Sequence, residues 1–154
     1  MRCFNGALAM RYLIGLAVLM GLGGFPSAAK AGSCCSTDMY QQADASLVSA
    51  AAGWGSLMRH QKAFGSCDDG ALAEGYSDAV VSLLAHRWDQ FDTFVGLSAR
   101  YPDFRRWAIR HIDASASTDD LTKVAHNAAR CPSSVKAKGL CREVARAARN
   151  ALND

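Results

Sequence analysis

Residues 71–88, ALAEGYSDAVVSLLAHRW, determine the fold that the sequence predicts. Placed on an α-helix at about 100° per residue, their apolar side chains form a wide arc, and only Glu74, Asp78 and Ser82 make a continuous polar strip. A helix with so narrow a polar face is normally covered by neighbours on most of its circumference. The sequence therefore predicts a central helix over 71–88 with the other helices packed around it. The arc consists of Leu72, Tyr76, Ala79, Val80, Leu83 and Leu84, with Val81 and Trp88 on the far side.

The segments on both sides of this helix also have helical periodicity, and no segment alternates with the period of a β-strand. The segment from Ser36 to Phe64 has the pattern of one amphipathic helix, in which Gly53 and Gly55 would permit a bend or the close approach of another helix. Four more helices are expected to begin near Asp89, Asp103, Thr118 and Leu140. The sequence thus predicts an all-α fold, a single compact bundle of five or six helices that is stapled by disulfides.

The first 31 residues have the layout of a cleaved secretory signal peptide. Basic residues at Arg2 and Arg11 precede an almost wholly apolar run over 12–22, and Ala29-Lys30-Ala31 offers the Ala-x-Ala pattern of a signal peptidase site. The apolar run is shorter than the roughly 20 residues of a transmembrane helix and is broken by glycines and a proline. Removal of the segment, rather than stable membrane anchoring, is therefore expected.

Two alternatives concern this leader. Met10 could be the true start, because the residues after it form a shorter, complete signal. Cys34 would permit a lipoprotein signal, although the usual large aliphatic residue three positions earlier is missing. In the favoured interpretation, cleavage leaves Gly32–Asp154 as a single helical domain of 123 residues in the periplasm or outside the cell.

The charge of the chain argues against a general nucleic-acid binder. The mature segment carries 14 basic and 14 acidic residues, so it is neutral overall. The distribution is uneven, because 32–104 carries 4 basic and 9 acidic residues, whereas 105–154 carries 10 basic and 5 acidic ones. This asymmetry predicts either attraction between the two halves of one fold, which we favour, or two faces offered to different partners.

Export would place the cysteines in an oxidising compartment, where neighbouring thiols form disulfides. Cys131 and Cys141 enclose a loop between two predicted helices, so we expect them to be bonded to each other. Cys67 is expected to pair with Cys34 or Cys35, which would join the N-terminal segment to the start of the central helix. The remaining thiol would be available for a disulfide-linked homodimer. With no C-x2-C pair and no histidine at zinc-finger spacing, no metal site is predicted.

Common catalytic signatures are missing from the sequence, including the G-x-S-x-G elbow, the phosphate-binding glycine loop and the H-E-x-x-H motif. No cofactor is therefore predicted. Glu74 and Asp78 lie one turn apart on the polar strip of the central helix and could form an acid and base pair. The favoured interpretation is that these two carboxylates are simply a solvated strip.

Among the histidines, His111 is the one candidate for catalysis, because it falls on the apolar face of its helix. An imidazole buried there needs a hydrogen-bond partner, so the favoured alternative is a buried histidine whose hydrogen bonds are satisfied within the fold. His86 borders the apolar arc and could meet His111 across the bundle. His60 and His126 are expected to be exposed.

A basic ridge on the last helix, formed by Arg142, Arg146 and Arg149, is the candidate binding site. Arginines on one face near the C-terminal end of a helix are stabilised by the helix dipole and usually face solvent. The same three side chains could instead bind an anion or an acidic protein partner.

Several short motifs resemble a group of small exported proteins of Gram-negative bacteria to which no activity is assigned. The resemblance covers about Phe64–Leu152 and rests on FGSCDDGA at 64–71, FRRW at 104–107 with RHID at 110–113, DDL at 119–121, and the pair Cys131-Pro132 and Leu140-Cys141. More distantly, the chain is similar in plan to the periplasmic immunity proteins that block type VI secretion amidase effectors. This plan implies a protein partner but assigns no site residue.

These features together predict a small exported helical protein, non-enzymatic, that acts by binding another protein, as an inhibitor or immunity factor does. One alternative is a small cell-envelope hydrolase that uses Glu74, Asp78 or a histidine. Another is a structural envelope protein that forms a disulfide-linked dimer through a spare cysteine.

Overall fold

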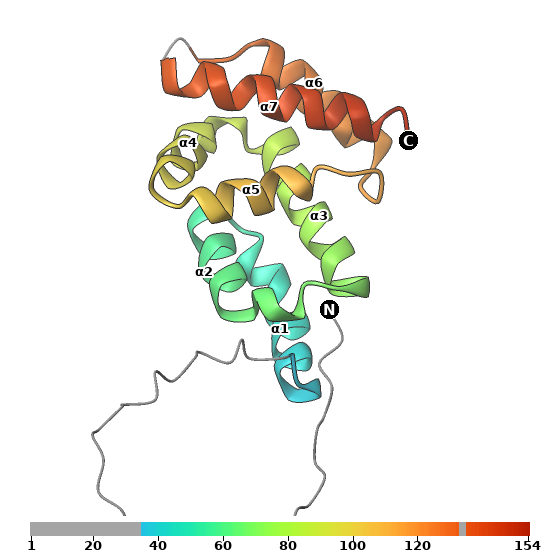
Figure 1. Cartoon of the computed structure of the whole chain (residues 1–154). Coiled ribbons are helices and arrows are strands. Elements are labelled where there is room, and N and C mark those ends of the chain that lie inside the picture. Colours follow the sequence, from blue (N-terminus) through green and yellow to red (C-terminus); the bar gives the residue numbers. More distant parts are fainter. Residues whose placement is uncertain (1–34, 133–134) are drawn as a thin grey trace, which may run out of the picture. The chain divides into compact units, whose positions relative to one another are not determined.

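The computed structural model of the protein describes residues 35–132 and 135–154, and the chain from Cys35 to Asp154 forms one compact unit (Figure 1). The predicted signal peptide and Cys34 lie outside the described residues. The all-α prediction is confirmed, since the described residues contain helices and no β-strand. The helices are α1 (Thr37–Ala50), α2 (Trp54–Phe64), α3 (Gly70–His86), α4 (Phe91–Arg100), α5 (Pro102–Arg110), α6 (Thr118–Ala129) and α7 (Val135–Ala151), with the short 3₁₀ helices η1 (Gly65–Cys67) and η2 (Trp88–Gln90).

The segment predicted as one helix over 36–64 is divided into α1 and α2. Ser36 caps α1 by accepting a hydrogen bond from the Met39 amide at 3.2 Å. At Gly53 the backbone is extended (φ −179°, ψ 165°), and the Ser56 hydroxyl lies 2.7 Å from the Ala50 carbonyl and 2.8 Å from the Gly53 carbonyl. The Ser56 hydroxyl therefore donates to carbonyl groups that the break leaves without a helical partner. With this break, the described residues contain seven α-helices.

The central helix of the prediction is α3, which runs from the end of the unit that holds α1 to the pair α6 and α7 (Figure 1). Its apolar arc is buried, whereas Glu74, Asp78 and Ser82 are exposed as predicted. Asp69 accepts a hydrogen bond from the Gly70 amide at 2.8 Å, at the start of the helix where Gly70 has φ +54°. The helix ends two residues earlier than predicted, because Arg87 leaves helical geometry.

An aromatic cluster joins α2, α4 and α5 in the core. Trp54 stacks on Phe94 with ring centroids 4.1 Å apart, and Phe104 packs edge-on against Phe94 at 6.2 Å. Phe104 also stacks on Trp107 at 5.6 Å. These contacts fix α5, the helix whose end carries His111, against the centre of the bundle.

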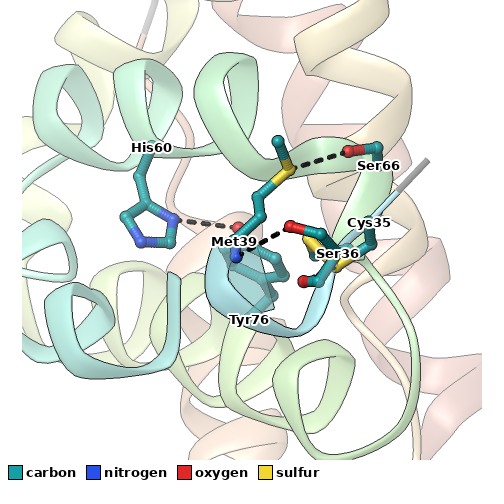
Figure 2. Close-up of a disulfide and its surroundings, with 7 residues drawn as sticks. Cys35, Ser36, Met39, His60, Ser66 and Tyr76 are labelled. Carbon is teal, nitrogen blue, oxygen red and sulfur yellow. Dashed lines mark hydrogen bonds between the residues drawn. A yellow bond between two sulfur atoms is a disulfide. The ribbon is translucent and has the colours of Figure 1, made fainter. Parts of the chain in front are cut away.

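Two disulfides tie the described helices. Cys35–Cys67 joins the residue before the α1 cap to η1, with Cα atoms 4.8 Å apart (Figure 2). Cys131–Cys141 links the end of α6 to α7, with Cα atoms 6.0 Å apart, and this pairing is as expected from the sequence. The loop predicted between the two cysteines is wrong, because α7 already begins at Val135 and not near Leu140. The structure thus selects Cys35, of the two adjacent cysteines, as the partner of Cys67. Within the described part of the chain, no helix combines the length and apolarity that a membrane span requires.

Candidate functional site

His111 lies at the end of α5 and is only 6% exposed, as expected from its position on an apolar face. Its Nε2 atom lies 3.1 Å from Oδ2 of Asp68, and its Nδ1 atom lies 3.0 Å from the Ser77 hydroxyl. Trp107 Nε1 donates to the same Asp68 oxygen at 2.9 Å. Asp113 completes the set by accepting from the Ser77 hydroxyl at 2.9 Å. We call Asp68, Ser77, Trp107, His111 and Asp113 the buried histidine network.

This network contains the residue types of a serine hydrolase triad, but its geometry is that of a structural cluster. Ser77 lies within α3 and is 1% exposed, so no substrate reaches its hydroxyl. Its single proton faces two acceptors, Asp113 at 2.9 Å and the Ala73 carbonyl at 3.2 Å, so its oxygen is left to accept from His111. The serine contacts Nδ1 and the carboxylate contacts Nε2, the reverse of the arrangement in which His activates a serine through Nε2.

Both ring nitrogens of His111 face acceptors, whereas Asp68 uses only Oδ2, and its Oδ1 atom is buried without a hydrogen-bond partner among the described residues. The pKa of Asp68 is lowered below its ordinary value. Burial alone would raise this pKa, but hydrogen bonds from His111 and Trp107 and the charges of His111 and Arg110 outweigh the effect of burial. The pKa of Asp113 is likewise lowered, because hydrogen bonds from Ser115 and Ser77 outweigh the effect of burial. The network therefore links α3, α5 and the turn at Asp68 by charged hydrogen bonds.

His60 is buried, at 6% exposed, and the prediction that it is exposed is wrong. It lies three residues after Leu57 on the face of α2 that packs on α1 and α3. Its Nε2 atom lies 3.0 Å from the Ala43 carbonyl, and its Nδ1 atom lies 2.9 Å from the hydroxyl of Tyr76 (Figure 2). A carbonyl can only accept, so Nε2 carries the proton and Nδ1 accepts from Tyr76. Burial lowers the pKa of His60, against the opposing effect of the Ala43 hydrogen bond.

The other candidate groups stay apart from this network. His86 contacts Asp120 on α6 at 2.9 Å, so it is paired there, and its expected meeting with His111 is not observed. His126 is exposed, as predicted. The exposed side chains of Glu74 and Asp78 lie on the solvent side of α3, whereas Ser77 faces inward. Among the described residues, no group of three or more His, Cys, Asp or Glu side chains is placed to hold a metal ion.

The three predicted binding residues, Arg142, Arg146 and Arg149, are exposed on one side of α7, and we call them the α7 arginine face. Within the described part of the chain, none of the three forms an ion pair. Arg105, by contrast, makes two hydrogen bonds to Glu143, the only acidic residue of α7. The charges of the α7 arginine face are therefore left for solvent or for a partner.

A depression of about 530 Å³ lies beside the α7 arginine face, and we call it the α6–α7 groove. Its buried lining is small and apolar, formed by Ala128, Cys141 and Ala145, and the partly buried Cys131 lies beside them. Its exposed lining consists of Ala129, Lys138 and the three arginines. A second depression, of about 370 Å³, lies between α5 and α7 and shares Arg146 with the first. The sequence did not predict Lys138 as part of this face, because 132–140 was expected to be a loop, whereas α7 begins at Val135. The groove was not predicted because it depends on how α6 packs against α7.

Direct ion pairing does not account for the uneven charge of the two halves. Among the described pairs of Lys or Arg with Asp or Glu, only Asp103 with Arg106 joins residues on opposite sides of the boundary, and these lie three residues apart. Two histidine–carboxylate contacts do join the halves over long range, His111 with Asp68 at 3.1 Å and His86 with Asp120 at 2.9 Å. Attraction between the halves is therefore limited to these contacts and does not involve the excess of Lys and Arg. The basic excess instead remains on the surface, with α7 as its densest part.

Comparison of the chain with protein-family models, curated proteins and solved structures finds no match.

Proposed function

We propose that the protein acts by binding another protein in the bacterial envelope, as an inhibitor or immunity factor does, and that the α7 arginine face is its binding surface. The observation that carries this proposal is the contrast in pairing. Arg105 is held by Glu143, whereas Arg142, Arg146 and Arg149 have no ion-pair partner among the described residues.

Arginine suits a binding surface for physical reasons. Its guanidinium forms two-pronged hydrogen bonds with carboxylates and is weakly hydrated, so arginines are enriched where protein interfaces derive most of their energy. A row of like charges also speeds association with an acidic surface by electrostatic attraction. A partner with an acidic surface is therefore the best match.

An exported location supports this proposal. The signal-like first 31 residues and the bonds Cys35–Cys67 and Cys131–Cys141 fit an oxidising compartment such as the periplasm or the cell exterior. Envelope compartments contain wall hydrolases and secreted toxins, the kinds of protein that an inhibitor or immunity factor would bind.

The alternative functions have less support. A hydrolase would need reactive groups at a surface that substrate can reach, but the buried histidine network is enclosed, and Glu74 and Asp78 are exposed on the solvent side of α3. A disulfide-linked dimer would depend on Cys34, which lies outside the described residues.

The test is a pull-down from the native envelope fraction with the oxidised protein, and mass spectrometry to identify what is captured. The binding variant is Arg142→Gln/Arg146→Gln/Arg149→Gln. The matched control, Arg59→Gln/Lys62→Gln/Arg100→Gln, removes the same charge from exposed sites on other helices. We expect a stoichiometric protein that the wild type and the control retain and the binding variant loses. Capture of nothing, or equal capture by both variants, would refute the proposal.

A further inference from the structure

We infer that the α6–α7 groove binds an acidic α-helix of the partner, laid alongside α7. This inference rests on the proposed function, because it names the element of the partner that the α7 arginine face recognises.

The spacing of the cations is the first argument. Lys138, Arg142, Arg146 and Arg149 follow one another at intervals of four, four and three residues, and all four line the groove. With a rise of about 1.5 Å per residue, they form a row about 16 Å long with a charge every 5 to 6 Å. Carboxylates at the same intervals on a second α-helix would have the same spacing. Each could then contact one cation when the two helices lie side by side.

The lining of the groove is the second argument. Ala128, Cys141 and Ala145 are buried, Cys131 is partly buried, and all four are small and apolar, so a partner can approach the helices closely and bury apolar side chains there. The walls are helices, whose inner backbone groups are already hydrogen bonded. An extended strand would find no sheet edge to pair with, whereas an α-helix satisfies its own backbone.

The position of competing charge is the third argument. Glu143 is the only carboxylate on α7, and its pairing with Arg105 directs it toward α5 and away from the groove. The groove therefore keeps its full positive charge. The carboxylates of an acidic helix would complement this charge, and its apolar side chains would complement the apolar lining.

The test uses a designed peptide probe of about 20 residues that carries glutamates at the four matching positions of one helical face and leucine and alanine beside them. A scrambled peptide of the same composition is the control. Binding to the oxidised protein is measured by fluorescence anisotropy at about 50 and 300 mM salt. We expect the helical probe to bind at least about tenfold more tightly than the scrambled peptide, and more weakly at high salt.

A steric variant separates this inference from the proposed function. Ala129 is exposed and lines the groove, so Ala129→Trp fills the groove while leaving every cation in place. Ala63→Trp, on the exposed side of α2, is the matched control. We expect Ala129→Trp to weaken the probe at least about tenfold and to lose the captured partner, and Ala63→Trp to do neither.

Three outcomes would overturn the inference. Equal binding of the scrambled peptide would identify a general anion surface, and unchanged binding by Ala129→Trp would place the probe outside the groove. A partner that is lost from the arginine variant but kept by Ala129→Trp would contradict the inference while leaving the proposed function intact. A probe that binds as expected while the envelope pull-down captures nothing would refute the proposed function alone.

Discussion

The buried histidine network and the α7 arginine face are both clusters of charged residues, but they differ in where their partners lie. In the network, His111 is held by Asp68 and Ser77, and Ser77 is held by Asp113. On α7, three arginines have no ion-pair partner among the described residues. Charged groups that are paired inside the chain stabilise the fold, whereas charged groups left unpaired at the surface are available to another molecule.

The same distinction applies to the motifs from which the sequence predicted a resemblance to small exported proteins. Its motifs contain Cys67, Asp68, Trp107 and His111, and the structure places these residues in a disulfide or in the buried network. Residues of this kind specify how a chain folds. Matching motifs of this kind would therefore indicate a shared fold and would leave the partner undetermined.

The largest expected loss of stability follows removal of the Cys35–Cys67 disulfide, which lies next to the buried histidine network. Cys67 immediately precedes Asp68, so Cys35→Ser/Cys67→Ser frees both the start of α1 and the turn that carries the Asp68 carboxylate. Opening a loop of 32 residues should lower the free energy of unfolding by about 4 kcal/mol. Cys131→Ser/Cys141→Ser opens a loop of 10 residues and should cost about 3 kcal/mol. Urea unfolding of the two variants measures the difference, and the opposite order would contradict this role of Cys35–Cys67.

The second prediction compares two adjacent aspartates. Asp68→Ala leaves the Trp107 and His111 donors without their carboxylate inside the fold, which should cost about 3 kcal/mol. Asp69→Ala removes only an exposed helix cap and should cost about 1 kcal/mol. Equal losses in urea unfolding would show that the network adds nothing beyond the cap.

The third prediction concerns acid. The pKa of Asp68 is lower in the folded protein than in the unfolded chain, so the unfolded chain binds the proton more readily. The contribution of Asp68 to stability is therefore complete above the unfolded pKa of about 4 and is lost as the pH falls through the folded pKa. The difference in unfolding free energy between wild type and Asp68→Ala should be constant between about pH 5 and 6 and should shrink below about pH 4. A difference that stays constant to about pH 3 would contradict the charged hydrogen bonds of the network.

The sequence predicted the structural features that residues close together in the chain determine. The apolar arc of α3 and the bond between Cys131 and Cys141 depend on local spacing, and both are found. For 36–64 the sequence predicted one helix in which Gly53 and Gly55 would permit a bend, whereas the structure has a full break at Gly53, because Ala50, Ala51 and Ala52 favour a continuous helix.

The features that sequence did not predict depend on the packing of distant helices. His60 is held by Ala43 and Tyr76, which lie 17 and 16 residues away, and His111 is held by Asp68, which lies 43 residues away. One local signal for His60 was present. Trp54, Leu57 and His60 recur at intervals of three and so share the face of α2 that is buried.

The smallest expected effect on stability concerns the α7 arginine face. Arg142 lies four residues from both Lys138 and Arg146, and each such pair of like charges destabilises a helix by about 0.2 to 0.5 kcal/mol. Arg142→Gln should therefore raise the free energy of unfolding by about 0.5 kcal/mol at low salt, and the gain should shrink at high salt. Arg149→Gln, near the C-terminal end of α7, should change the free energy of unfolding by less than about 0.3 kcal/mol, because loss of the favourable interaction with the helix dipole offsets the relief of repulsion from Arg146. Urea unfolding at low and high salt measures both, and a loss of more than about 1 kcal/mol in Arg142→Gln would place that arginine among the residues that hold the fold. A gain would mean that the chain keeps a repulsive row of cations at some cost to its own stability, as expected of a surface whose carboxylates come from another protein.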